Sequence, residues 1–217
     1  MDNLNRYIDH TLLKPDATRE DIQNICREAV EYSFFSVCIN PFNIPYAVPI
    51  LEDTDVRICT VIGFPLGADL YELKANEAKD ACMLGADELD MVINIGALKD
   101  KEYDMVKKDI LSVVHVAKSN KALTKVILET SLLTDDEIII ACNIAKEAGA
   151  DFVKTSTGFA KEGGATIHAV KLMREVVGEK VGVKASGGIR TKRDAIEMIE
   201  AGASRIGASS SIDIIKV

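Results

Sequence analysis

The feature of this sequence that most restricts its fold is a regular alternation between two kinds of segment. Short runs rich in apolar and β-branched residues are each followed by a longer stretch in which apolar residues recur with a helical period. The runs with the composition of buried strands are 7–10, 34–39, 56–62, 88–93, 125–129, 151–154, 181–184 and 204–206. The stretches predicted to be helices are 19–32, 70–84, 102–119, 135–148, 165–177 and 192–201. This alternation predicts a parallel sheet built from βα units.

Repeated local signals support this prediction. Gly85, Gly149 and Gly202 each follow a predicted helix, at the position where glycine commonly ends one. The phrases LGADELDMV, AGADFVKTS and AGASRIGAS repeat one order of helix end, glycine and strand. Eight strands in a chain of 217 residues predict a single-domain (β/α)8 barrel over residues 1–217. A doubly wound open sheet is the alternative fold.

Composition narrows the possible functions. The net charge of −8 argues against a nucleic-acid surface, which needs concentrated Lys and Arg to displace counterions from phosphates. The five cysteines are scattered without a C-x-x-C pair, which favours reduced thiols. The three histidines are far apart, which argues against a zinc site. The first residues have the character of neither a secretion signal nor a membrane span, and we expect a cytoplasmic protein.

Two lysines end consecutive predicted strands. Lys154 is followed by Thr155, Ser156, Thr157 and Gly158, and Lys184 ends the strand in VGVKASGGIR. Because the carboxyl ends of barrel strands meet at one mouth, we expect the two ammonium groups to lie close together. Their repulsion and partial desolvation favour the neutral form of one of them, which is an amine nucleophile. The alternative interpretation is that each lysine extends from its strand end to water.

Asp90 lies in an apolar strand, between Leu89 and Met91. A carboxylate in such a setting needs a partner, because a bare buried charge is costly. Either lysine is a candidate partner. One interpretation is a structural ion pair, and the other makes Asp90 a proton-transfer group beside the amine. Cys38, at the end of the second predicted strand, is interpreted as a small core residue.

Small residues follow the last two predicted strands. Gly187 and Gly188 follow one of them, and Gly207, Ser209 and Ser210 follow the other. Loops at these two positions form the usual phosphate site of a (β/α)8 barrel, so we expect a small phosphorylated ligand. Tight βα turns also need glycine for their own geometry, so either motif alone is weak evidence.

In combination, the motifs of the whole chain resemble those of the deoxyribose-phosphate aldolases, a family of class I aldolases with a (β/α)8 barrel. The segments that carry the resemblance are IDHTLLKPDAT, VCINP, VIGFPLG, ELDMVINIGALK, KVILETSLLT, FVKTSTGF, VKASGGIR and SRIGASS. The resemblance implies reversible cleavage of 2-deoxy-D-ribose 5-phosphate to D-glyceraldehyde 3-phosphate and acetaldehyde, in deoxyribonucleotide catabolism. It implies no metal and no cofactor.

The resemblance also implies roles for individual residues. Lys154 matches the Schiff-base lysine, Lys184 the second lysine that lowers the pKa of the first, and Asp90 the proton-relay aspartate. Residues implied to shape the substrate and phosphate pocket are Gly158, Gly187, Gly188, Gly207, Ser209 and Ser210, with Asp9 and Thr11 near the substrate. Two departures are notable. Ser211 stands where many relatives have glycine, and the last tyrosine is Tyr103, whereas some relatives end in a tyrosine that reaches the active site.

Two other functions stay open from the residues alone. One is a different barrel enzyme for sugar phosphates, such as an isomerase or a metal-dependent aldolase. The other is a non-catalytic protein that binds a phosphorylated ligand. The sequence indicates little about oligomeric state, and a homodimer is the expectation because small barrels often pair through their helical faces.

Overall fold

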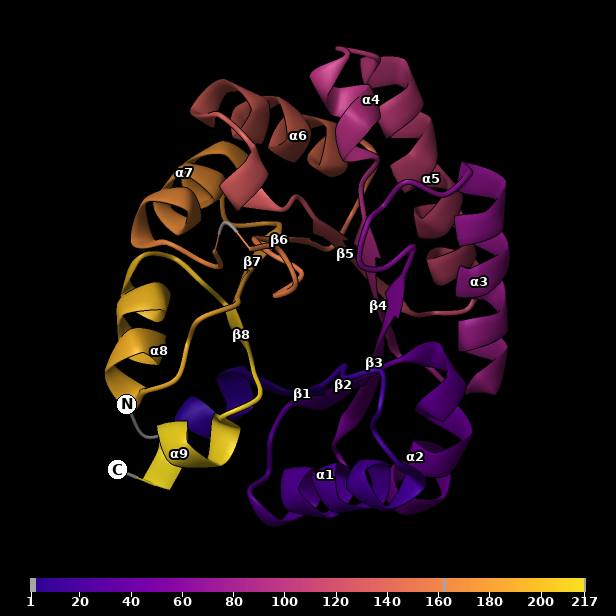
Figure 1. Cartoon of the computed structure of the whole chain (residues 1–217), viewed down its shortest axis with the longest axis vertical. Helices are drawn as coiled ribbons and strands as arrows, with labels where there is room; N and C mark the ends of the chain where they lie inside the picture. The colour runs from indigo at the N-terminus through magenta and orange to yellow at the C-terminus, as the bar shows by residue number, and fades with distance from the viewer. Residues whose placement is uncertain (1–2, 162, 217) are drawn as a thin grey trace.

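The computed structural model describes residues 3–161 and 163–216, and in these residues a closed barrel of parallel strands forms the centre of the molecule (Figure 1). Each strand pairs with the next along the chain, and pairing of the first with the last closes the ring. The strands are β1 (Ile8–Leu12), β2 (Ser36–Ile39), β3 (Arg57–Ile62), β4 (Glu88–Val92), β5 (Leu123–Ile127), β6 (Phe152–Lys154), β7 (Gly182–Ser186) and β8 (Arg205–Ala208). The predicted (β/α)8 barrel is therefore confirmed, and the open sheet is wrong.

The helices surround the barrel, as Figure 1 shows. Those that agree with the predicted segments to within two residues at each end are α1 (Arg19–Glu31), α3 (Tyr71–Leu84), α5 (Tyr103–Ser119), α6 (Asp135–Glu147), α7 (Ile167–Val177) and α8 (Lys192–Glu200). Capping boxes begin three of them, at Thr18, Thr134 and Thr191. These agreements reflect signals that lie within each helix itself.

Three short α-helices were not predicted. They are α2 (Ile44–Leu51), α4 (Ile95–Lys99) and α9 (Ser211–Lys216), accompanied by the 3-10 turns η1 (Leu4–Tyr7), η2 (Pro41–Asn43) and η3 (Thr130–Leu132). Pro49 lies inside α2, where proline normally argues against a helix. The other two helices are too short to display a helical period.

Strand boundaries differ from the prediction where the site is built. β5 begins at Leu123 and not at Lys125, so Lys125 occupies the middle of the strand. β7 continues past Lys184 to Ser186, and β1 continues past His10 to Leu12. Side chains alternate between the two faces of a strand, so the face on which a residue lies depends on its place along the strand and not on where the strand ends.

The space between strands and helices is apolar, whereas the inside of the barrel contains a layer of charged side chains. Seven charged residues on the strands are at most 4% exposed: Asp9, Glu88, Asp90, Lys125, Lys154, Lys184 and Arg205. We call this set the charged layer. Buried charges persist only where they are paired, so the contacts among these groups decide the chemistry of the site. Among the described residues, no helix combines the length and apolar character that crossing a bilayer requires.

Candidate active site

The two lysines identified from the sequence meet at one carboxylate. Lys154 and Lys184 are register partners on β6 and β7. The Nζ atom of Lys154 lies 2.7 Å from Oδ2 of Asp90, and the Nζ atom of Lys184 lies 2.8 Å from the same oxygen. The two ammonium groups thus share one anion, and both lysines that were candidate partners of Asp90 contact it. The structure brings all three predicted catalytic residues together, and their roles remain predictions.

The second oxygen of Asp90 contacts a lysine that the sequence argument missed. The Nζ atom of Lys125 lies 2.8 Å from Oδ1 of Asp90 and 2.6 Å from Oε2 of Glu88. Burial by itself raises the pKa of Asp90, but the three neighbouring ammonium groups outweigh it and hold the pKa well below its usual value. Asp90 is therefore an ionised carboxylate. Lys125 escaped notice because it was placed at the start of its strand, away from the mouth.

Lys184 is also paired with Asp9, whose Oδ2 atom lies 2.5 Å from its Nζ atom. Burial lowers the pKa of Lys184, but the carboxylates of Asp9 and Asp90 outweigh it and raise the pKa well above its usual value. Asp9 also accepts a hydrogen bond of 2.8 Å from Nη1 of Arg205. Asp9 is fully buried in this network and does not line the cavity described below, although the sequence argument placed it near the substrate. Lys184 consequently stays an ammonium group.

The charged layer contains more cations than anions. Its four cationic residues face three carboxylates. The cation with the fewest ionic contacts is Lys154, which has a single carboxylate partner and shares it with two other lysines. Lys154 is therefore the cation of the layer with the least compensation from neighbouring carboxylates.

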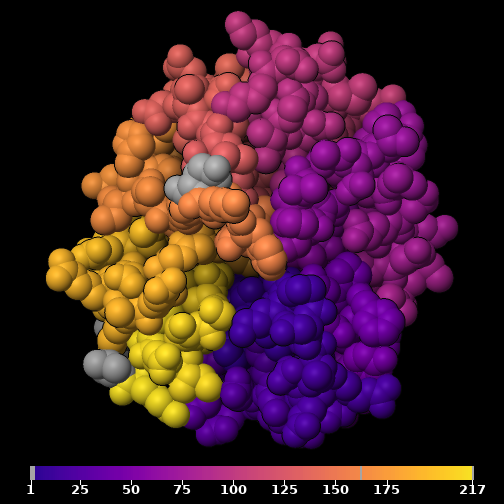
Figure 2. All heavy atoms as spheres, in the orientation of Figure 1, coloured from indigo at the N-terminus to yellow at the C-terminus, as the bar shows by residue number. Residues whose placement is uncertain are grey.

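A cavity of about 330 Å³ opens at the carboxyl ends of the strands. Its walls come from the loops after β1, β6, β7 and β8, and Lys154 lies in it. Figure 2 shows this face of the molecule, hollowed near the centre where N-terminal, middle and C-terminal segments meet. The sequence-predicted pocket residues that line the cavity are Thr11, Gly158, Gly187, Gly188, Gly207 and Ser209. Ser210 does not line it, although its neighbour Ser209 does.

Gly207 has a packing role that the sequence did not reveal. A Cβ atom added at this position would lie 3.0 Å from Cε of Lys184 and 3.0 Å from Cβ of Ser186. Glycine therefore leaves the space through which the Lys184 side chain reaches Asp90. A role in letting a ligand approach the backbone remains a prediction for this residue.

Two further cations line the cavity and were missed. Lys14 follows β1, and Arg190 follows the Gly187 and Gly188 pair. Both belong to the loops at the mouth, where an anionic ligand would enter. A larger hollow of about 680 Å³ shares Arg190 but lies against Ile196 of α8 and Asp213 of α9, and it contains none of the charged layer.

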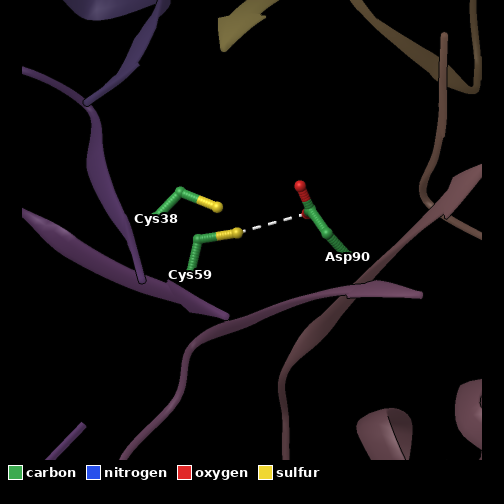
Figure 3. Close-up of side chains that lie close together, drawn as sticks. All are labelled: Cys38, Cys59 and Asp90. Atoms are coloured by element: carbon green, nitrogen blue, oxygen red, sulfur yellow. Dashed lines mark hydrogen bonds between the residues drawn. The ribbon is translucent and has the colours of Figure 1, made fainter. Parts of the chain in front are cut away.

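Three side chains deep in the barrel have the spacing of a metal site. Cys38, Cys59 and Asp90 place their ligand atoms within 4.8 Å of one another (Figure 3). The ammonium group of Lys125, however, lies 3.2 Å from Sγ of Cys59 and 2.8 Å from Oδ1 of Asp90. A lysine ammonium group thus already contacts two of the three ligand atoms, and the residues do not fit a metal ion without its displacement.

Cys38 and Cys59 are register partners on β2 and β3. The hydrogen bond between the two thiols lowers the pKa of Cys38 to about 7, against the effect of burial. Both cysteines are fully buried, in a small apolar cluster with Leu13 and Val61. This placement agrees with the interpretation of Cys38 as a small buried residue, and it adds a polar contact that composition does not indicate.

Comparison with known proteins places the chain among aldolases. A family model described as DeoC/LacD family aldolase matches residues 4–215. A deoxyribose-phosphate aldolase of Clostridium novyi is 63% identical over 214 residues, which cover 99% of this chain and 96% of the relative. One of Enterococcus faecalis is 61% identical over 98% of this chain and 96% of the relative. A tetrameric deoxyribose phosphate aldolase structure from Aeropyrum pernix has a TM-score of 0.91 at 38% identity, covering 97% of this chain and 88% of that one.

Proposed function

Because the chain belongs to the DeoC/LacD family of aldolases, we propose that it reversibly cleaves 2-deoxy-D-ribose 5-phosphate into D-glyceraldehyde 3-phosphate and acetaldehyde. The reaction follows the Schiff-base course of a class I aldolase, with Lys154 as the nucleophile. One observation carries this assignment. Lys154 is the member of the charged layer that also lines the cavity.

The first step is attack of the neutral Lys154 amine on the aldehyde carbon, C1, of the open-chain sugar. Oδ2 of Asp90, 2.7 Å from that nitrogen, is in position to accept the released proton and return it to the carbinolamine oxygen. Loss of water then gives an iminium ion between C1 and Nζ. The ammonium group of Lys184 shares Asp90 with Lys154 and so opposes a second positive charge there, which favours release of the Lys154 proton after each turnover.

The iminium ion makes the next bond cleavage possible. Its positive nitrogen withdraws the electron pair of the bond between C2 and C3, and the C3 hydroxyl loses its proton as glyceraldehyde 3-phosphate departs. The remaining two-carbon enamine takes up a proton at C2. Hydrolysis then releases acetaldehyde and restores Lys154. Every step uses only side chains of this chain and water.

The phosphate group of the substrate is assigned to the loops after β7 and β8. Gly187 and Gly188 line the cavity shortly before the start of α8, where the helix dipole favours an anion. Arg190 and Lys14, on two of the cavity walls, add positive charge. In this proposal the reacting aldehyde lies deep in the barrel at Lys154 and the phosphate lies at the mouth of the cavity.

The proposal extends to a cytoplasmic enzyme of deoxyribonucleotide catabolism that forms a homodimer. Exposed apolar side chains on the outer face of α3, at Leu73 and Met83, support association of copies through a helical face. Sedimentation analysis of the purified chain tests the dimer.

The deciding experiment is borohydride reduction in the presence of acetaldehyde, followed by peptide mapping. The expected result is an ethyl group on Lys154, because reduction traps the iminium ion formed with the two-carbon product. A metal-dependent aldolase or an isomerase would yield no adduct, and activity of the former would be lost to chelators. A protein that only binds phosphorylated ligands would bind the sugar phosphate without a trapped product.

A further inference from the structure

Glu129 is a buried carboxylate near the cavity that does not belong to the charged layer. It follows β5 by two residues and is 3% exposed. Its backbone lies in the left-handed region, with φ 57° and ψ 63°. Residues other than glycine seldom adopt this conformation, and they retain it where surrounding contacts enforce it. The position of such a residue beside a cavity calls for a physical reason.

The carboxylate of Glu129 holds one turn of the cavity wall. Its Oε2 atom accepts a hydrogen bond of 3.1 Å from the backbone N–H of Thr157 and a second, shorter one from the Thr157 hydroxyl. The hydroxyl oxygen in turn accepts the backbone N–H of Phe159 at 3.0 Å. Gly158, between them, adopts a φ of 85°. The carboxylate therefore fixes both ends of the 157–159 turn.

Backbone hydrogen bonds on both sides of Glu129 tie its segment to the chain that leads into the 157–159 turn. The N–H of Leu128 donates to the carbonyl of Lys154 at 2.9 Å, and the N–H of Thr130 donates to the carbonyl of Thr155 at 2.8 Å. Glu129 lies between these two links. With a left-handed conformation at Glu129, the backbone on either side of it stays paired with Lys154 and Thr155. The Glu129 side chain meanwhile reaches Thr157, beyond these paired residues.

The 157–159 turn forms part of the cavity, whereas Glu129 itself does not line it. The turn packs against the glycine loop after β7, because a Cβ atom added at Gly187 would lie 3.7 Å from Cα of Gly158. At its outer end, the ring of Phe159 contacts the ring of Phe64 edge-on at 5.3 Å between centroids. The shape of the turn therefore determines the shape of the cavity wall beside Gly187.

We infer that Glu129 is a positioning residue, which acts through Thr157 to hold the 157–159 turn in the shape that receives the phosphate end of the substrate. The inference rests on the proposed function for the identity of that substrate. It goes beyond that function in assigning phosphate affinity to a residue that does not contact the ligand. Charge-assisted hydrogen bonds of this kind are about twice as strong as neutral ones, so their loss should loosen the turn measurably.

The test compares Glu129→Gly with the unaltered enzyme. Glycine retains the left-handed backbone without strain and removes the whole side chain, including the carboxylate that binds Thr157. We expect the dissociation constant of inorganic phosphate, measured by calorimetry, to rise about tenfold, and KM for 2-deoxy-D-ribose 5-phosphate to rise in parallel. We expect kcat to stay within about threefold and the borohydride trapping of acetaldehyde on Lys154 to be unchanged, since the charged layer is untouched.

Two variants of Thr157 distinguish loss of its hydrogen bond to Glu129 from a general loss of stability. Thr157→Val removes the hydroxyl at nearly constant shape and should weaken phosphate binding in the same direction. Thr157→Ser keeps both hydrogen bonds to Glu129 and should restore the original affinity. A matched control is Glu137→Gln, because Glu137 also accepts a threonine N–H, that of Thr134 at 2.8 Å, but does so at the start of α6 away from the cavity.

The inference is overturned if folded Glu129→Gly binds inorganic phosphate as tightly as the unaltered enzyme. It is equally overturned if acetaldehyde trapping falls together with phosphate affinity, because the residue would then act on the amine. Should Glu129→Gly not fold, Thr157→Val decides by the same two measurements. An unaltered enzyme that binds phosphate but does not cleave the sugar phosphate would refute the proposed function and leave this positioning role standing.

Discussion

Lys154 and Lys184 are register partners on neighbouring strands, and their Nζ atoms both lie within 2.8 Å of one oxygen of Asp90. This sharing allows two lysines to be buried side by side in a barrel interior. It also couples them, because a proton lost from one changes the charge that the common carboxylate must balance for the other.

We expect Lys184→Met to abolish adduct formation near neutral pH. Without this ammonium group the layer has no surplus positive charge, so Lys154 should retain its proton. The variant also leaves Asp9 and Asp90 short of a cation, which should lower the free energy of unfolding by about 3–5 kcal/mol. Borohydride trapping with acetaldehyde and urea denaturation measure the two effects. Trapping at the normal level in the folded variant would show that Lys184 does not control the amine.

Asp90→Asn should reduce kcat by about 10²–10⁴-fold, because Lys154 loses both its charge partner and its proton acceptor. Asp109→Asn is the matched control. Asp109 forms a buried ion pair of 2.7 Å with Lys74, outside the cavity. Both variants should lose stability, but only the first should lose turnover once folded protein is compared. Equal losses of turnover in the two variants would show that Asp90 has only a structural role, as a member of an ion pair.

Gly207→Ala should lower kcat/KM by about tenfold or more, because the added Cβ atom would lie 3.0 Å from Cε of Lys184 and displace that side chain. Gly96→Ala, in α4, is the control, since an added Cβ atom there approaches nothing closer than 3.5 Å. Steady-state kinetics on both variants test the expectation. Unchanged kcat/KM for Gly207→Ala would mean that the space beside Lys184 is not needed.

Stability should fall as the solution is acidified. The pKa values of Asp9 and Asp90 are lower in the folded protein than in the unfolded chain, where they are about 3.9. The unfolded state thus binds more protons than the folded state at acidic pH. The stabilisation from these two carboxylates is fully present above their pKa in the unfolded chain, and it is lost as the pH falls through their pKa values in the folded protein. Urea midpoints across acidic pH should therefore decrease more steeply for the unaltered enzyme than for Asp90→Asn. Identical slopes would contradict the folded-state ion pairs.

Local periodicity was enough to predict the barrel and most of its helices. The signals for α1 or α8, a cap and an apolar stripe, lie within the helix, so tertiary contacts are not needed to recognise them. The same reasoning failed for α2, whose Pro49 argues against a helix that packing nevertheless maintains. It also misplaced the start of β5, since a lysine in mid-strand conflicts with the apolar pattern of a buried strand.

The sequence alone determined the strand and helix order, the two lysines at strand ends and the acid among apolar neighbours, because these are properties of contiguous segments. Only the tertiary structure decided which charges meet. Closure of β1 against β8 brings Asp9 within 2.8 Å of Arg205, 196 residues away along the chain. Lys125 and Glu88 enter the same network through the barrel interior. Ion pairs depend on distance in space, and barrel closure makes residues neighbours whatever their separation in sequence.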